Sequence, residues 1–313
     1  MIGSNKAILL GAEGAVMKRI NLIGFLLLFL CLAAAVFYSV VRAQQGDDTT
    51  RKLWDTVYTS NSKSSNKRRT YRIATPKVPV NDVAPDSVVG VTLWRLRPAG
   101  ARDSGERIIV HDDSESKEYL PERISPETKL GQGDKLRISV EGARNGYLYV
   151  IDREQYADGT VGPPYLIFPT TRTLNGDNKV SVGMLTEIPA QVDSPPFFTV
   201  RKSRPDHVAE VLSVLVAPKP LEGITITDKA QQLTSDQVAA WEKQWNSGVG
   251  FLEMGQPGQA WTKEERDAAG TRALTPSAPA PQLVFYRTAA LANQPMFVKL
   301  QLWYRAPAKR THH

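Results

Sequence analysis

The sequence predicts a mainly β protein: an antiparallel β-sandwich, Ig-like in general architecture, with a small helical extension and an N-terminal signal or anchor helix. Three observations support this fold class. Short stretches that alternate apolar and polar residues recur along residues 88–217. Gly, Asn and Pro turn residues separate these stretches. No long helical pattern falls between them, which disfavours a βαβ fold.

The individual strands follow from alternation and turn chemistry. Residues 135–140 alternate strictly between polar and apolar side chains, which predicts a strand with one solvent-facing side. The turn at residues 142–146 ends in Asn145-Gly146, a pair that adopts positive φ at little cost, and it leads into a second strand over residues 147–152. The other strands are expected at residues 88–96, 107–110, 165–168, 179–182, 197–200 and 210–217.

The pattern becomes helical after residue 221. Ser235 is predicted to cap a helix over residues 236–245, whose apolar side chains share one face. Residues 262–265 have the form of a capping box and predict a second short helix. Two late strands, at residues 283–287 and 296–304, are expected to rejoin the sandwich.

The chain therefore divides into five expected parts. They are a signal peptide or membrane anchor (1–43), a basic, Pro- and Ser-rich tether (44–87), the β-sandwich domain (88–220), a helical extension with a linker (221–281), and the C-terminal strands with a short tail (282–313).

The N-terminal leader predicts export to the periplasm or the cell surface. An almost wholly apolar run over residues 22–41 follows Lys18 and Arg19, which remain on the cytoplasmic side. Val41-Arg42-Ala43 offers the small residues of a signal-peptidase site. The alternative is an uncleaved anchor in the inner membrane, because about 20 apolar residues can span a bilayer. The leader pattern begins at Met17, which makes Met17 the alternative start to Met1.

The distribution of charge disfavours a nucleic-acid-binding domain. Residues 1–77 hold 12 Lys and Arg against 4 Asp and Glu, whereas the rest of the chain holds 27 against 28. The predicted folded part is therefore close to neutral and lacks the basic face that such a domain needs. The basic tether is expected to be a solvated linker or to adhere to an anionic membrane surface or cell-wall polymer.

No active site is predicted from the residue types. The only cysteine, Cys31, lies in the leader, so a cleaved chain has no thiol or disulfide. His111 and His207 are both expected on exposed turns, where a general base lacks a packed orienting partner. Acidic residues 152, 154 and 158 are spaced too loosely for a calcium loop. We therefore expect no catalytic residue, cofactor or metal ligand, although carboxylates paired only in space leave no sequence signature.

Four aromatic residues form the candidate binding surface. Trp94, Tyr147, Tyr149 and Trp303 lie in predicted strands, and on one exposed face they would stack on a sugar or an aromatic peptide. The alternative is that they fill the core or form cross-strand pairs.

A longer pattern spans residues 120–220. It runs through Gly133-Asp134-Lys135-Leu136, then Gly146-Tyr147-Leu148-Tyr149-Val150, Asp158-Gly159 and Ile167-Phe168-Pro169. This pattern resembles a bacterial envelope family of domains of unknown function, numbered four-three-eight-four. The resemblance implies an accessory or sensing role without catalytic residues, since members occur beside kinase and peptidase modules.

The sequence thus favours a non-enzymatic exported envelope protein whose β-domain binds a protein or an envelope polymer. Two alternatives remain, namely an exported hydrolase with a spatially assembled site and a structural spacer without a ligand. A cluster of buried carboxylates or a His-centred triad would favour the hydrolase, and an exposed apolar or aromatic patch would favour binding.

The leader yields the first testable prediction. We expect the mature chain to begin near Gln44, because the apolar run ends at a signal-peptidase site. N-terminal sequencing of protein from the membrane and soluble envelope fractions measures this. An intact leader in all of the material would leave only the anchor.

Overall fold

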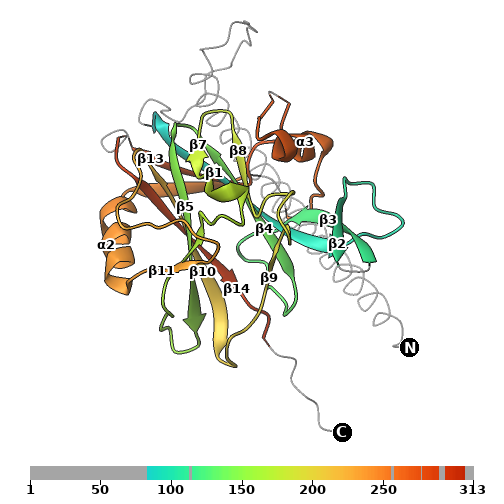
Figure 1. Cartoon of the computed structure of the whole chain (residues 1–313), viewed down its shortest axis with the longest axis horizontal. Helices are drawn as coiled ribbons and strands as arrows, with labels where there is room; N and C mark the ends of the chain where they lie inside the picture. Colours follow the sequence, from blue (N-terminus) through green and yellow to red (C-terminus); the bar gives the residue numbers. More distant parts are fainter. Residues whose placement is uncertain (1–82, 113–114, 255–256, 276, 289–292, 307–313) are drawn as a thin grey trace, which may run out of the picture. The chain divides into compact units, whose positions relative to one another are not determined.

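The structure is a computed structural model in which residues 83–112, 115–254, 257–275, 277–288 and 293–306 are described (Figure 1). The described chain is mainly β, with two antiparallel sheets, one of which curls into a half-barrel, and two short helices. The predicted leader and nearly all of the predicted tether lie outside the described residues. Within the described ranges, no helix is long and apolar enough to cross a membrane.

The first sheet is organised around one long strand, β1 (Val83–Pro98). Along one side β1 pairs with β13 (Leu283–Thr288) and β3 (Glu115–Arg123), and along the other with β4 (Lys135–Gly142). The remaining strands of this sheet are β2 (Ile108–Asp112), β8 (Leu185–Ile188), β9 (Phe198–Thr199) and β12 (Val249–Glu253).

The second sheet is organised around the pair β5 (Gly146–Tyr156) and β10 (His207–Ala217). Its other strands are β6 (Tyr165–Phe168), β7 (Lys179–Val180), β11 (Gln231–Gln232) and β14 (Met296–Trp303). The C-terminal strands β13 and β14 thus belong to different sheets, one beside β1 and the other beside β10.

The main core lies between the two sheets. Alternate residues of both sheets fill it, because successive side chains of a strand point to opposite faces. Its buried members include Val91, Leu93, Ile138 and Val140 from the first sheet and Val150, Val214 and Val298 from the second.

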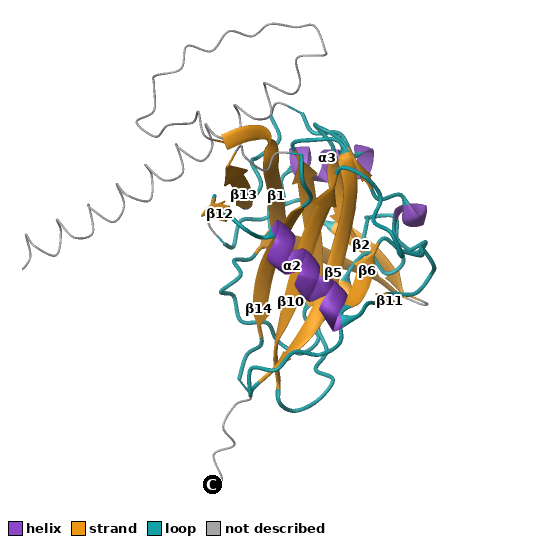
Figure 2. Ribbon diagram, turned by 90° about the vertical axis from the view of Figure 1, so that its left-hand side faces the viewer, coloured by secondary structure: helices purple, strands orange, loops and turns teal. Residues whose placement is uncertain are grey.

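Helix α2 (Ser235–Trp245) covers the outer face of the second sheet (Figure 2). Its buried Val238 packs with Tyr149, Leu215 and Phe297. Thr234, not the predicted Ser235, is the N-cap, since the Thr234 side chain accepts a hydrogen bond from the Gln237 backbone N–H.

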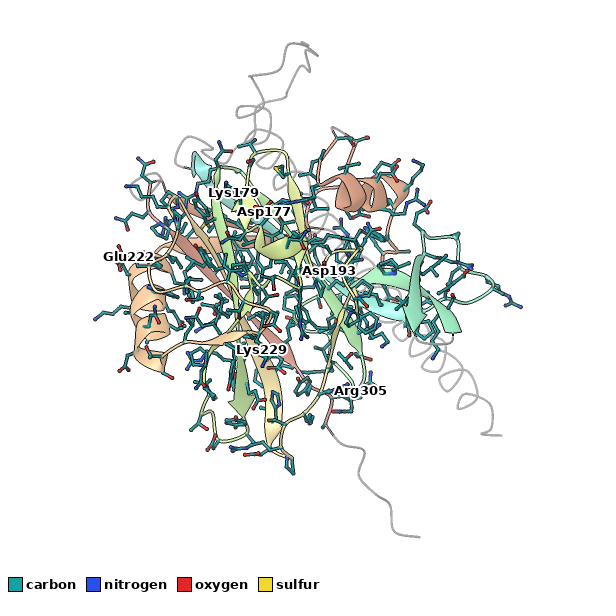
Figure 3. The ribbon with its side chains drawn as sticks, viewed as in Figure 1. Asp177, Lys179, Asp193, Glu222, Lys229 and Arg305 are labelled. Carbon is teal, nitrogen blue, oxygen red and sulfur yellow. The ribbon has the colours of Figure 1, made fainter. Side chains whose placement is uncertain are left out.

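Helix α3 (Lys263–Thr271) covers part of the outer face of the first sheet, together with Trp261. The predicted capping box is present: Thr262 and Glu265 each accept a hydrogen bond from the other's backbone N–H. The end of the helix is tied to the turn before β7, because Arg272 pairs with Asp177 at 2.9 Å. Figure 3 shows Asp177 and Lys179 at one end of the described domain and Arg305 toward the other.

The prediction that residues 135–140 form a strand with one solvent-facing side is wrong. Arg137, Ser139 and Glu141 lie on the outer face of β4 and are at most 5% exposed. The segment that carries α3 covers them, and β8 borders them. The alternation was a correct sign of a strand, but both faces of that strand are buried.

The core supports a stability prediction. Val214→Asp is expected to abolish cooperative folding, because it places a carboxylate at a 1% exposed position between the sheets. Val192→Asp is the matched control, since Val192 is 89% exposed and should change the unfolding free energy by no more than about 0.5 kcal/mol. Urea unfolding followed by circular dichroism measures both. A Val214→Asp variant that folds as stably as the wild type would contradict the position of the core.

Candidate functional site

A cavity of about 200 Å³ lies between the two sheets. Apolar side chains form most of its wall, among them Leu93, Leu136, Ile138, Phe198, Leu212 and Leu302. Its polar lining includes Asp152, Glu210 and Tyr304. Two acids therefore face an otherwise largely apolar space.

The pairing of β5 with β10 brings the acids together. Asp152 lies opposite Leu212, and Glu154 lies opposite Glu210. Directly opposed residues of an antiparallel pair share one face, and so do residues two apart in a strand. Asp152, Glu154 and Glu210 therefore lie on the same face as Leu212, a member of the main core.

The carboxyl groups of Asp152 and Glu210 lie close enough to interact electrostatically. Burial raises the pKa of both acids above their ordinary values. The charge of Asp152 raises the pKa of Glu210 further, because two neighbouring negative charges repel each other in a buried setting. Glu210 also accepts a hydrogen bond from the Tyr304 hydroxyl. Among the described residues, no donor group reaches Asp152 Oδ1 or Glu210 Oε2.

Glu154 has the opposite electrostatic environment. Burial acts to raise its pKa, but hydrogen bonds from Ser203 Oγ (2.6 Å) and Tyr156 Oη (2.8 Å) outweigh this and lower the pKa below its ordinary value. Glu154, beside the cavity, and the two acids that line it thus have pKa values shifted in opposite directions, a pattern typical of functional sites.

The prediction that His207 is an exposed turn residue is wrong. His207 begins β10 and is fully buried. Its Nδ1 accepts from the Ser203 backbone N–H at 3.4 Å, so its Nε2 carries the proton and donates to the Ala209 carbonyl at 3.0 Å. Nε2 also lies 3.4 Å from Glu210 Oε1. His207 therefore lies in direct contact with Glu210, one of the two acids of the pair.

A second group of buried charges lies under α3. Arg123 pairs with Glu265, and Arg137 pairs with Glu187; all four side chains are at most 9% exposed. The Arg123 guanidinium lies 5.3 Å from the centre of the Trp94 ring, a cation–π contact. The adjoining void measures only about 10 Å³, enough for one water molecule and no larger ligand.

Glu141 is the one acid of this second group without a hydrogen-bonding partner among the described residues. It is 5% exposed, and burial raises its pKa to about 8, although the nearby charge of Arg123 works against this. At neutral pH the proton is therefore retained, and the group serves as a buried neutral acid.

The four predicted surface aromatics do not gather on one exposed face. Trp94 is buried and packs against Trp261, with ring centres 6.1 Å apart. Tyr149 is buried under the α2 face, where its hydroxyl accepts from the Leu221 N–H, and Tyr147 packs nearby. Trp303 is half-buried, with Lys129 Nζ 5.0 Å from its ring centre.

The remaining sequence candidates add no site. The side chain of His111 lies outside the described residues, although its backbone belongs to β2. Within the described part of the chain, no group of three or more His, Cys, Asp or Glu residues is arranged to hold a metal ion.

Comparison with known proteins adds nothing to this geometry. No protein-family model, curated protein or solved structure matches the chain.

The buried acids predict how stability depends on pH. Between about pH 4.5 and about 8 the folded state keeps the Glu141 proton, whereas the unfolded chain loses it. The unfolding free energy should therefore fall as pH rises through this window, by up to roughly 1.4 kcal/mol per pH unit from this group.

Urea unfolding of wild type and Glu141→Gln at pH 5, 6, 7 and 8 isolates that contribution. The glutamine variant should show a flatter decline, whereas the exposed-site control Glu222→Gln should follow wild type. Equal slopes for wild type and Glu141→Gln would contradict the retained proton.

Proposed function

We propose that this chain is an exported envelope protein that binds, between its sheets, a small apolar group carrying a hydrogen-bond donor. The cavity carries the proposal, because its largely apolar wall contains two acid oxygens, Asp152 Oδ1 and Glu210 Oε2, that no described donor reaches. A buried acceptor without a partner costs about 1–3 kcal/mol, which a bound donor would offset.

The size of the cavity limits the ligand. An apolar cavity of about 150 Å³ can bind benzene, so about 200 Å³ suits a single ring or a short branched chain. The ligand would be a small molecule or a terminal group of an envelope protein or polymer. The Ig-like sandwich and the envelope family are part of the same proposal, supported by the core shared between sheets and by the pattern of residues 120–220.

A second candidate is the exported hydrolase. It is favoured by the proximity of Asp152 and Glu210, since two neighbouring acids with different pKa values can act as general acid and general base. We place it second because a cavity of this volume, walled mostly by apolar side chains, accommodates a ring but not a segment of peptide or polysaccharide. Turnover of small esters that disappears in Asp152→Asn would reverse this order.

A cavity-filling variant tests the binding proposal. Ile167 lines the cavity, so Ile167→Phe should occupy its space, whereas Ile109→Phe makes the same change at a 56% exposed strand position. We expect 2-phenylethanol and indole to raise the melting temperature of wild type and Ile109→Phe but not of Ile167→Phe. If neither compound stabilises the wild type, the proposal fails.

A further inference from the structure

The acid pair in the cavity has no strongly basic counterpart in the protein. No described Lys or Arg forms an ion pair with Asp152 or Glu210. Arg137, which also lines the cavity, pairs with Glu187 and donates to the Pro189 carbonyl. No described Lys or Arg side chain therefore neutralises the acidic end of the cavity.

We propose that the cavity binds a primary amine with an apolar body, whose ammonium group donates hydrogen bonds to Asp152 Oδ1 and Glu210 Oε2. This inference rests on the binding function proposed above. An ammonium group has three donors and a positive charge, so it can serve both acid oxygens at once. A neutral alcohol offers one donor, and a carboxylate ligand would add a further negative charge beside the pair.

The surroundings of the pair are consistent with a cationic ligand. From β5, Glu154 adds a third carboxyl nearby. From β10 and from the residue after β14, His207 and Tyr304 contact Glu210. Two basic side chains lie nearby, namely Lys202, whose Nζ lies 5.4 Å from the Tyr304 ring centre, and Arg204, which pairs with Asp206 and helps to lower the pKa of Glu154. Acidic groups therefore outnumber unpaired basic groups around the pair.

Binding of an ammonium group should be linked to proton release. Without a ligand the acids tend to hold their protons, because burial and the repulsion between two neighbouring charges raise their pKa values. A bound cation favours the ionised forms. Affinity should therefore increase as pH rises from about 6 to about 9, while an alkyl amine with a pKa near that of lysine, about 10.4, remains charged.

The experiment compares three probes on the full chain by calorimetry at pH 6, 7 and 8. The probes are 2-phenylethylamine, the neutral 2-phenylethanol and the anion 3-phenylpropionate. At pH 8 we expect the amine to bind at least about tenfold more tightly than the alcohol, as for a charge-assisted hydrogen bond. The propionate should bind more weakly than either, and amine affinity should increase with pH.

Substitutions then locate the effect. Asp152→Asn and Glu210→Gln should each abolish the preference for the amine over the alcohol while the alcohol still binds. Glu141→Gln is the matched control, since it also neutralises a buried acid but on the outer face of β4, and it should keep the preference. Alcohol binding by each variant shows that the cavity has folded.

The outcomes separate the two proposals. Alcohol binding without any preference for the amine would overturn the present inference and leave the apolar binding function standing. Binding of none of the three probes would overturn both. A final arm compares Phe-Gly-amide with 2-phenylethylamine at pH 7, where both amines are mostly charged. Affinities within tenfold of each other show that a peptide N-terminus can supply the amine, and weaker binding of the peptide than this indicates a free amine.

Discussion

The pairing of β5 with β10 is the constraint on which the rest of the structure depends. Residues 148–151 of β5 and residues 211–217 of β10 are buried, so apolar residues cover both faces of this pair. Alternate polar residues that continue either strand therefore point toward the main core. Asp152 and Glu210 occupy such positions, and the register places them on the face of the main core. The cavity and its acids are thus direct results of extending two doubly buried strands past their apolar stretch.

Much of the mainly β fold could be predicted from the sequence where the pattern is local. The alternation over residues 135–140, the Asn145-Gly146 turn and the capping box before α3 each specify an element within a few residues. No comparable local pattern predicts β3, whose residues 115–118 are all polar and hide its period, or the four-residue strand β8. Alternation also does not predict whether another segment covers the polar face of a strand. Helix α3 and the residues around it, far away in the sequence, bury the face of β4 that was expected to be exposed to solvent.

The candidate site was much less predictable. Asp152 and Glu210 are separated by 58 positions, and only the strand register brings them together. His207 was misplaced because Pro205 and Asp206 resemble a turn, and they do form one, but the residue after it begins β10. A usable signal did exist: an acid at the end of a continuous apolar run, as in Tyr147 to Asp152, indicates a charge carried into an interior.

The carboxylate of Glu265 has two roles in the attachment of α3. Its Oε2 accepts the Thr262 backbone N–H in the capping box, and its Oε1 pairs with Arg123 on β3. Fraying of the first helical turn would therefore also leave the buried Arg123 guanidinium without its ion-pair partner, which is strongly destabilising. Unfolding of the first turn alone is therefore disfavoured relative to detachment of the whole helix from the sheet. The helix should open and close as one cooperative unit, so that its interior amides exchange with solvent at a common rate.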